Sequence, residues 1–221
     1  MISIEANIGS GKSTFLKKIK ESGEKSFNVI NEPLDEWQNT YSANGENILG
    51  NFYSDQERWS YTFQSNAFIT RIQKYERESV SDKINLSERS PLSDYNIFAK
   101  MLKEDGKIDE IEWKLYQNWY TWLIEKFNAK PKAIIYLKCS PEVSFARIKK
   151  RDRNEENNIP YEYIKRVHDF HEEWLMNESD IPVLIINANN DFEDNESRFQ
   201  EIMSQVKLIL LNSADNSFLL K

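Results

Sequence analysis

The sequence predicts an α/β fold in which a five-stranded parallel sheet carries helices on both faces. Short apolar runs with β-branched residues recur along the chain, and longer segments with helical periodicity separate most of them. This alternation is typical of parallel sheets, because each return to the same end of the sheet needs a crossover connection. The first apolar run leads directly into a glycine-rich loop that opens a helix.

The predicted strands are short, and turn-forming or polar residues border most of them. They cover residues 2–5, 27–30, 84–86, 133–137 and 183–186. The predicted helices cover residues 13–20, 55–79, 92–103, 109–127, 142–150, 161–176 and 196–211. No repeat or low-complexity linker divides the chain. We therefore expect a single domain over residues 1–211, followed by a polar and then apolar tail over residues 212–221.

Composition excludes several classes of protein. A length of 221 residues suits one domain, and no stretch approaches the roughly 18 consecutive apolar residues of a membrane helix. The net charge of −7 argues against general nucleic-acid binding, which needs a basic surface. The single cysteine, Cys139, cannot form an intramolecular disulfide and suggests a reducing compartment. The sequence starts on a strand without a signal-peptide pattern, so we expect the cytoplasm unless a leader has been removed.

The strongest chemical signal is a phosphate-binding loop between the first strand and the first helix. Its sequence is Ala6-Asn7-Ile8-Gly9-Ser10-Gly11-Lys12-Ser13-Thr14. In this context it predicts a Walker A motif, whose backbone N–H groups hold phosphate oxygens. Lys12 would reach the β- and γ-phosphates of ATP, and the Ser13 hydroxyl would bind Mg²⁺. Ala6 replaces the usual first glycine, which is acceptable only if its φ is negative.

Charged residues follow the next two predicted strands. Glu32 comes after the second strand, and Glu88 and Arg89 follow the third. Ligands bind at the carboxyl ends of strands in open α/β sheets, so these groups suit a metal and phosphate site. Glu32 could accept a proton from an attacking hydroxyl. The competing interpretations are a loop carboxylate or helix cap for Glu32 and a surface ion pair for Glu88 and Arg89.

A basic segment lies at the end of the helix predicted over residues 142–150. It includes Arg147, Arg151 and Arg153, and the first two share one helical face. Such runs are commonly solvated faces. Beside a phosphate-binding loop, however, these arginines could close over a triphosphate, so we expect a lid around residues 147–158.

Together these motifs resemble the deoxyribonucleoside kinase family, specifically its deoxycytidine and deoxyguanosine kinase branch. The resemblance runs from Ile2 to about Val206. Its motifs are the loop 6–14, Asn31-Glu32-Pro33 with Trp37, the segment 57–65, Glu88-Arg89-Ser90 with Ser93-Asp94, and the segment 151–156. It implies a P-loop kinase fold, ATP as phosphate donor, Mg²⁺, a deoxynucleoside acceptor and a homodimer.

The resemblance also implies roles for individual residues. Lys12, Glu32 and Arg89 would be catalytic, with Glu32 as general base, and Ser13 and Glu88 would hold Mg²⁺. The donor nucleotide would contact Gly9, Ser10, Gly11, Lys12, Ser13, Thr14, Arg147, Arg151, Arg153, Asp191 and Phe192. The nucleoside would contact Ile8, Trp37, Leu49, Tyr53, Phe63, Gln64, Ala67, Arg71, Arg89, Asp94, Phe98 and Glu156. Tyr53 and Glu156 would bind the sugar 3′-hydroxyl, and Gln64 would bind the base.

Base preference rests on three positions of one helical face, Gln64, Ala67 and Arg71, and on Asp94. In the family an arginine and an aspartate at the positions of Arg71 and Asp94 accompany cytosine and purine acceptance, so we expect deoxycytidine or purine deoxynucleosides to be favoured over thymidine. The alternatives are a structural salt bridge between these two residues, a thymidine-preferring or broad-specificity kinase, a monophosphate kinase, and a nucleotide-dependent switch.

Overall fold

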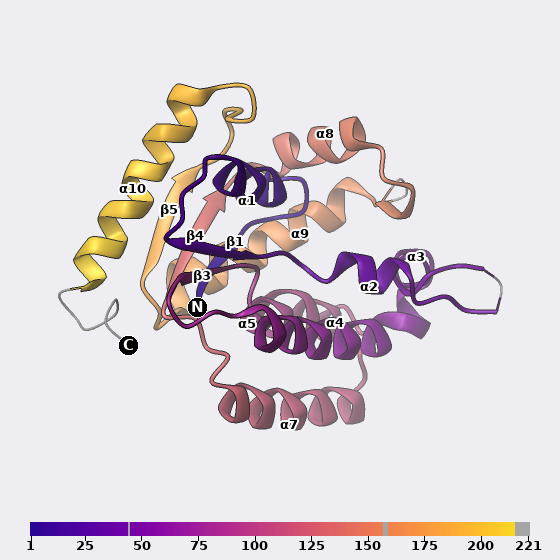
Figure 1. Cartoon of the computed structure of the whole chain (residues 1–221). Coiled ribbons are helices and arrows are strands. Elements are labelled where there is room, and N and C mark those ends of the chain that lie inside the picture. The colour runs from indigo at the N-terminus through magenta and orange to yellow at the C-terminus, as the bar shows by residue number, and fades with distance from the viewer. Residues whose placement is uncertain (44, 157–158, 215–221) are drawn as a thin grey trace.

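A parallel five-stranded sheet lies at the centre of the structure, with helices around it (Figure 1). The computed structural model describes residues 1–43, 45–156 and 159–214, with the backbone alone for residues 209–214. The strands are β1 (Ile2–Glu5), β2 (Phe27–Ile30), β3 (Ile84–Glu88), β4 (Ala133–Lys138) and β5 (Val183–Asn187), in the spatial order β2-β3-β1-β4-β5. The predicted fold class is confirmed, and each predicted strand is present with at most two residues added.

The strand register places the candidate catalytic segments at one end of the sheet. Ile4 of β1 is level with Glu88 of β3, and Ile30 of β2 is level with Ser87. Because the three strands are parallel, their carboxyl ends point the same way. The loop after β1, the loop after β2 and the end of β3 therefore lie next to one another.

The helices vary in length from one turn to more than six turns. They are α1 (Lys12–Glu21), α2 (Leu34–Gln38), α3 (Ile48–Ser54), α4 (Gln56–Glu78), α5 (Pro91–Ser93), α6 (Lys100–Glu104), α7 (Glu110–Phe127), α8 (Pro141–Arg151), α9 (Tyr161–Glu172) and α10 (Glu196–Ala214). Two π-helical segments, η1 (Asp94–Ala99) and η3 (Glu173–Glu178), and a 3₁₀ turn, η2 (Asn154–Glu156), complete the described elements.

The helices differ from the sequence prediction in three ways. The segments predicted over residues 92–103 and 161–176 are not continuous α-helices, because η1 and η3 occupy part of each. Helices α2 and α3 were not predicted. Helix α10 continues to Ala214 and so enters the predicted tail, whereas residues 215–221 lie outside the described part of the chain.

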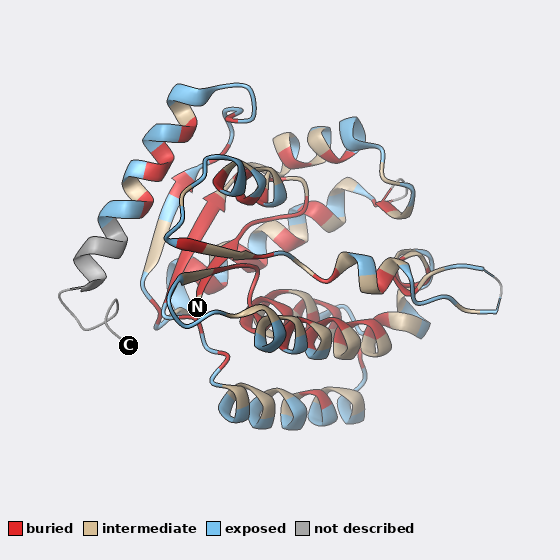
Figure 2. Cartoon of the chain, in the orientation of Figure 1, coloured by how far each residue is buried: buried red, intermediate tan, exposed pale blue. Residues whose placement is uncertain are grey.

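Alternate residues of the sheet face two separate cores. Ala133, Ile135 and Leu137 of β4 pack with the buried residues of α1 and α10, whereas Ile134 and Tyr136 pack with η1, α6, α9 and η3. Figure 2 shows the strands mostly buried and the outer helical faces exposed. Both faces of the sheet are therefore covered, as the sequence predicts.

A third hydrophobic cluster lies beside the sheet and joins α3, α4 and α7. It includes Phe52, Phe63 and Phe68, and the rings of Phe52 and Phe63 stack at 4.7 Å. This cluster packs α3 and α4 against each other beside the candidate site. Among the described helices, none combines the length and the apolar character that crossing a membrane requires.

Candidate active site

The glycine-rich loop between β1 and α1 has the conformation of a phosphate-binding loop. Gly9 and Gly11 have φ values of 77° and 92°, which favour glycine. A Cβ at Gly9 would lie 2.5 Å from the carbonyl oxygen of Ser144, so a side chain there would clash with α8. Ala6 is buried and is not among the residues with positive φ, which meets the condition that its methyl group imposes.

Lys12 lies at the start of α1 and is buried within this loop. Its Nζ donates hydrogen bonds to the carbonyl oxygens of Ala6 at 3.2 Å and of Asn7 at 3.1 Å. Burial, followed by the nearby positive charge of Arg89, lowers the pKa of Lys12 to about 7. An incoming polyphosphate would supply the negative charge that this ammonium group needs.

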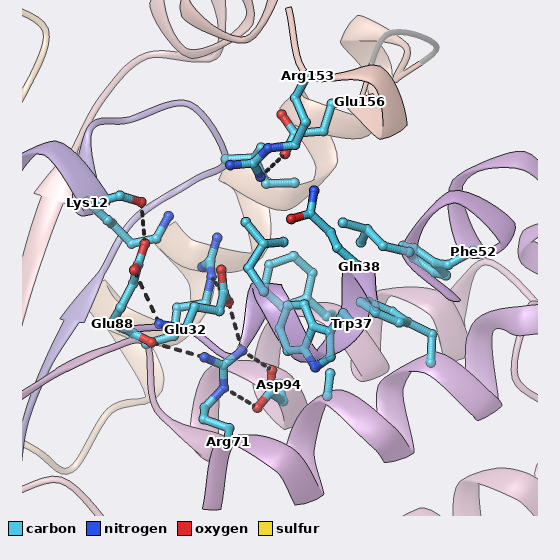
Figure 3. A pocket seen from close by; sticks show the side chains of 18 of the residues that line it. Lys12, Glu32, Trp37, Gln38, Phe52, Arg71, Glu88, Asp94, Arg153 and Glu156 are labelled. Carbon is cyan, nitrogen blue, oxygen red and sulfur yellow. Dashed lines mark hydrogen bonds and ion pairs between the residues drawn. The ribbon is translucent and has the colours of Figure 1, made fainter. Parts of the chain in front are cut away.

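The Ser13 hydroxyl and the Glu88 carboxylate form a hydrogen-bonded pair. Figure 3 shows Glu88 beside Lys12. Ser13 Oγ donates to Glu88 Oε1 at 2.6 Å, and the backbone N–H of Glu32 donates to Glu88 Oε2 at 3.3 Å. A hydroxyl and a carboxylate are the oxygen ligands that suit Mg²⁺, which completes its shell with water and phosphate oxygens. Among the described residues there is no group of three or more His, Cys, Asp or Glu side chains that could hold a metal without such help.

Glu32 lies two residues beyond β2 and between two arginines. Its Oε1 is 2.9 Å from Arg71 Nη2 and 3.4 Å from Arg89 Nε. Burial raises the pKa of the Glu32 carboxyl, but the charges of Arg71 and Arg89 outweigh this effect and lower the pKa to about 2. Glu32 is therefore ionised at neutral pH, as a proton acceptor must be.

Arg71 of α4 forms the most extensive set of polar contacts in the site. Its Nε is 2.7 Å from Asp94 Oδ2 and its Nη2 is 3.0 Å from Asp94 Oδ1, a bidentate ion pair. Its Nη1 donates to the carbonyl oxygen of Glu88 at 3.0 Å. The Arg71 and Asp94 side chains are both buried, so the pair is shielded from water.

Arg89 occupies a strained backbone conformation at the end of β3. Its φ of 64° lies in the left-handed region, which residues with side chains rarely adopt. Its N–H donates to the carbonyl oxygen of Ile4 at 3.0 Å, and its Nη1 donates to that of Ala6 at 2.8 Å. The guanidinium also lies over the ring of Phe98, 4.8 Å from its centre. These contacts direct the Arg89 charge toward Glu32 and the phosphate-binding loop.

A cavity of about 540 Å³ opens beside these charged groups. Every residue predicted to contact a nucleoside lines it: Ile8, Trp37, Leu49, Tyr53, Phe63, Gln64, Ala67, Arg71, Arg89, Asp94, Phe98 and Glu156. The edge-to-face pair of Trp37 and Phe63 forms part of its apolar wall. An aromatic wall with a few polar groups suits a nucleobase and its sugar.

Seven further lining residues were not predicted as site residues: Asn31, Leu34, Asp35, Gln38, Phe52, Lys74 and Tyr163. Phe52 belongs to the unpredicted helix α3. The Tyr163 hydroxyl is buried and has no hydrogen-bond partner in the described structure, which leaves it available to a ligand. Helical spacing from Phe63 and Arg71 could have pointed to Lys74, which shares their helix.

A second hollow of about 380 Å³ lies on the other side of the phosphate-binding loop. Its lining includes Gly11, Thr14, Asp191 and Phe192, as predicted for the donor nucleotide, together with Arg147, Arg151 and Arg153. The Ser10 side chain does not line it. Instead, Ser10 Oγ lies 2.9 Å from Ser144 Oγ in a buried pair.

The three arginines predicted as a lid have different partners. Arg147 donates to the carbonyl oxygens of Ala188 at 2.8 Å and Asn189 at 3.2 Å, so it braces the loop after β5. Arg151 and Arg153 both pair with the buried Glu156. Arg151 and Arg153 thus contact the residue predicted to bind the sugar. Residues 157–158 of the predicted lid lie outside the described residues.

Comparisons with known proteins agree with this geometry. The family model for deoxynucleoside kinase matches residues 2–211. The chain is 40% identical to the probable deoxycytidine kinase FPV151 of fowlpox virus, across 93% of this chain and 86% of that protein. It is 36% identical to the mitochondrial deoxyguanosine kinase of Xenopus laevis, across 93% and 88%, and 36% identical to human deoxycytidine kinase, across 95% and 90%.

The fold and the phosphate-binding loop define a P-loop phosphotransferase. The chain belongs to the deoxynucleoside kinase family.

The environment of Glu32 generates a prediction about its ionisation. Because Arg71 and Arg89 hold the pKa near 2, the ¹³C-carboxyl signal of Glu32 should not titrate between about pH 7 and pH 4, where an ordinary glutamate begins to protonate. In Arg71→Met/Asp94→Ala, one fewer arginine would oppose the effect of burial on the Glu32 carboxyl, so the pKa of Glu32 should rise into this range. The Glu32→Gln variant identifies the signal. A wild-type midpoint near 4.3 would contradict the assignment.

Proposed function

We propose that this enzyme transfers the γ-phosphate of ATP to the 5′-hydroxyl of deoxyribonucleosides, with deoxycytidine or purine deoxynucleosides favoured. The observation that carries the proposal is the meeting of two hollows at one group of charges. Gly9, Lys12, Ser13, Arg151 and Arg153 line both the cavity and the donor hollow. A substrate hydroxyl in the cavity would therefore lie opposite a phosphate bound to the loop, with the positive side chains of Lys12, Arg151 and Arg153 around them.

This reaction requires little covalent chemistry from the protein. Phosphoryl transfer depends on alignment and on positive charge around the equatorial oxygens. Lys12, Arg151 and Arg153 would supply that charge, and Glu32 would orient the hydroxyl and accept its proton. A carboxylate with a low pKa is a weak base, so we infer that proton transfer occurs late, once the leaving phosphate has taken up much of the charge.

Mg²⁺ would bind beside the donor phosphates. The Ser13 hydroxyl and the Glu88 carboxylate are the groups that would hold it, and their 2.6 Å contact places both oxygens next to the loop. When bound, Mg²⁺ would neutralise charge on the β- and γ-phosphates. Residues Asp191 and Phe192 would lie near the donor base, because both line the donor hollow.

Base selection would depend on Gln64 and on the Arg71–Asp94 pair. All three side chains are buried in the cavity wall. The amide of Gln64 can form paired hydrogen bonds with a nucleobase edge. The ordered Arg71–Asp94 pair narrows the space that a thymine methyl group would need. The names of the relatives, deoxycytidine and deoxyguanosine kinases, support this preference over the thymidine-preferring alternative.

A homodimer is the proposed assembly, formed through the outer face of α7. Ile111, Leu115, Trp119 and Trp122 are between 45% and 71% exposed on this helix, an apolar face typical of a subunit interface. In Figure 1, α7 lies at the edge of the molecule with one side away from α4. The proposed compartment is the cytoplasm, on the evidence of the single cysteine.

The dimer generates a prediction. Trp119→Glu/Trp122→Glu should shift the sedimentation coefficient from that of a dimer to that of a monomer, because four buried charges would face one another across a two-fold interface. Lys114→Glu, a change elsewhere on the same helix, serves as the control for altered charge. If the double variant sediments as the wild type does, this face of α7 is not the dimer interface.

The proposed reaction predicts that ADP forms quickly only when a deoxynucleoside is present. Glu32→Gln should reduce kcat by roughly 10²–10⁴, the range for loss of a general base, while deoxycytidine still binds. The measurement is ADP release with and without deoxycytidine, together with calorimetric nucleoside binding. Nucleoside-independent ADP release would favour a nucleotide-dependent switch. Near wild-type turnover in Glu32→Gln would remove Glu32 from the mechanism.

The specificity proposal predicts a shift toward thymidine in Arg71→Met/Asp94→Ala. Both partners are changed together because a single change would leave a buried unpaired charge. The ratio of kcat/KM for deoxycytidine to that for thymidine should fall by about 10- to 200-fold, the range for one steric and polar difference. An unchanged ranking would mean that the pair only braces α4 against η1.

A further inference from the structure

The turn η2 contacts the segments on both sides of the loop between α2 and α3 through the carboxylate of Glu155. Glu155 Oε1 accepts a hydrogen bond from Gln38 Nε2 at 3.0 Å and another from Asn47 Nδ2 at 2.9 Å. All three side chains are half-buried. The two donors come from segments that precede and follow the loop between α2 and α3, so one oxygen atom joins three parts of the chain.

Each donor is attached to a wall of the nucleoside cavity. Gln38 ends α2, directly after Trp37, and lines the cavity itself. Figure 3 shows its amide between Trp37 and the Arg153–Glu156 pair. Asn47 caps α3, because its Oδ1 accepts from the N–H of Gly50 at 2.8 Å. Helix α3 in turn carries Leu49 and Tyr53 into the cavity.

The next residue of η2 contacts side chains that line the donor hollow. Glu156 pairs with Arg151 and with Arg153, and both arginines line the donor hollow. Two consecutive carboxylates of η2 therefore have different partners. Glu155 binds the wall of the nucleoside cavity, and Glu156 binds the arginines over the phosphate-binding loop.

The ionisation of Glu155 suits this double acceptor role. Burial raises the pKa of its carboxyl, but hydrogen bonds from Asn47 and Gln38 outweigh burial, and the pKa lies below its ordinary value. The group is a carboxylate at neutral pH and can only accept, which matches two amide donors.

We propose that Glu155 is a positioning residue that couples the two substrate sites, so that nucleoside binding and donor binding strengthen each other. This inference rests on the proposed function, which puts a nucleoside in the cavity and ATP on the loop. A nucleoside packed against Trp37 and Tyr53 restricts α2 and α3. Through Glu155 the same restriction reaches η2 and the arginines that bind the donor phosphates. Coupling of this kind is reciprocal, and typical values are about 5- to 150-fold.

The test measures the affinity for a non-hydrolysable ATP analogue with Mg²⁺, by calorimetry, with and without saturating deoxycytidine. In the wild type, deoxycytidine should tighten analogue binding by about 5-fold or more. In Glu155→Ala the effect should fall below about 2-fold, while the affinity without nucleoside stays within about 2-fold of the wild type, because Glu155 touches neither ligand. The control is Glu162→Ala, an exposed residue of α9 that removes the same charge.

An exchange of partners separates coupling from simple loss of structure. Gln38→Glu places two carboxylates together and should abolish the nucleoside effect. Gln38→Glu/Glu155→Gln restores one amide and one carboxylate, so it should recover the nucleoside effect on analogue affinity even if nucleoside affinity itself is altered.

Three results would overturn the coupling. They are a full nucleoside effect in Glu155→Ala, an equal loss of analogue affinity with and without deoxycytidine, and no recovery in the exchanged pair. If deoxycytidine binds the wild type but leaves analogue affinity unchanged, the coupling is wrong and the proposed function stands. If neither deoxycytidine nor a purine deoxynucleoside binds, both are wrong.

Discussion

The buried guanidinium of Arg71 is the interaction on which the rest of the site depends. It joins the Asp94 carboxylate, the Glu32 carboxylate and the carbonyl oxygen of Glu88 within one hydrogen-bonded group. These partners come from η1, the loop after β2 and the end of β3. One side chain of α4 therefore fixes three segments that are distant in the sequence, and it does so at the end of the sheet where ligands bind.

Burying this charge is unfavourable unless every donor finds a partner. A charge moved away from water loses several kcal/mol of solvation, which only well-aligned opposite charges and hydrogen bonds can offset. Asp94 supplies a bidentate partner, and Glu32 supplies a second carboxylate that remains 21% exposed at the cavity. Arg71 therefore both fixes the position of Glu32, the proposed proton acceptor, and keeps its carboxyl ionised. Alignment is therefore favoured over basicity, which suits a reaction limited by geometry.

The sequence was most informative where one local pattern determines both structure and chemistry. The loop Gly9–Thr14 has a fixed spacing, and the strands that lead to Glu32 and Glu88 are apolar runs with clear limits. The Arg71–Asp94 pair followed from helical spacing combined with the family resemblance. Helices α2 and α3 were missed because they have 5 and 7 residues, too few for helical periodicity to emerge. The π-helical turns η1 and η3 were missed for a different reason, since their backbone hydrogen bonds follow tertiary packing and not composition. Glu155 was missed because its partners, Gln38 and Asn47, flank a loop whose path the sequence does not determine.

The backbone of Arg89 shows how this site opposes local stability. A left-handed φ of 64° costs a residue with a side chain of order 1–2 kcal/mol, and glycine would remove that strain. Glycine would also remove the guanidinium that lies over Phe98 and beside Glu32. The backbone turn at this position therefore favours glycine, whereas the charge beside Glu32 requires arginine, and no single residue supplies both. Arginine there means that the turn is held by its surroundings, through Ile4 and Ala6 of the central strand and its loop, and not by its own preference. Selection for thermal stability alone would favour glycine at this position, so the arginine there reflects a requirement for its charge.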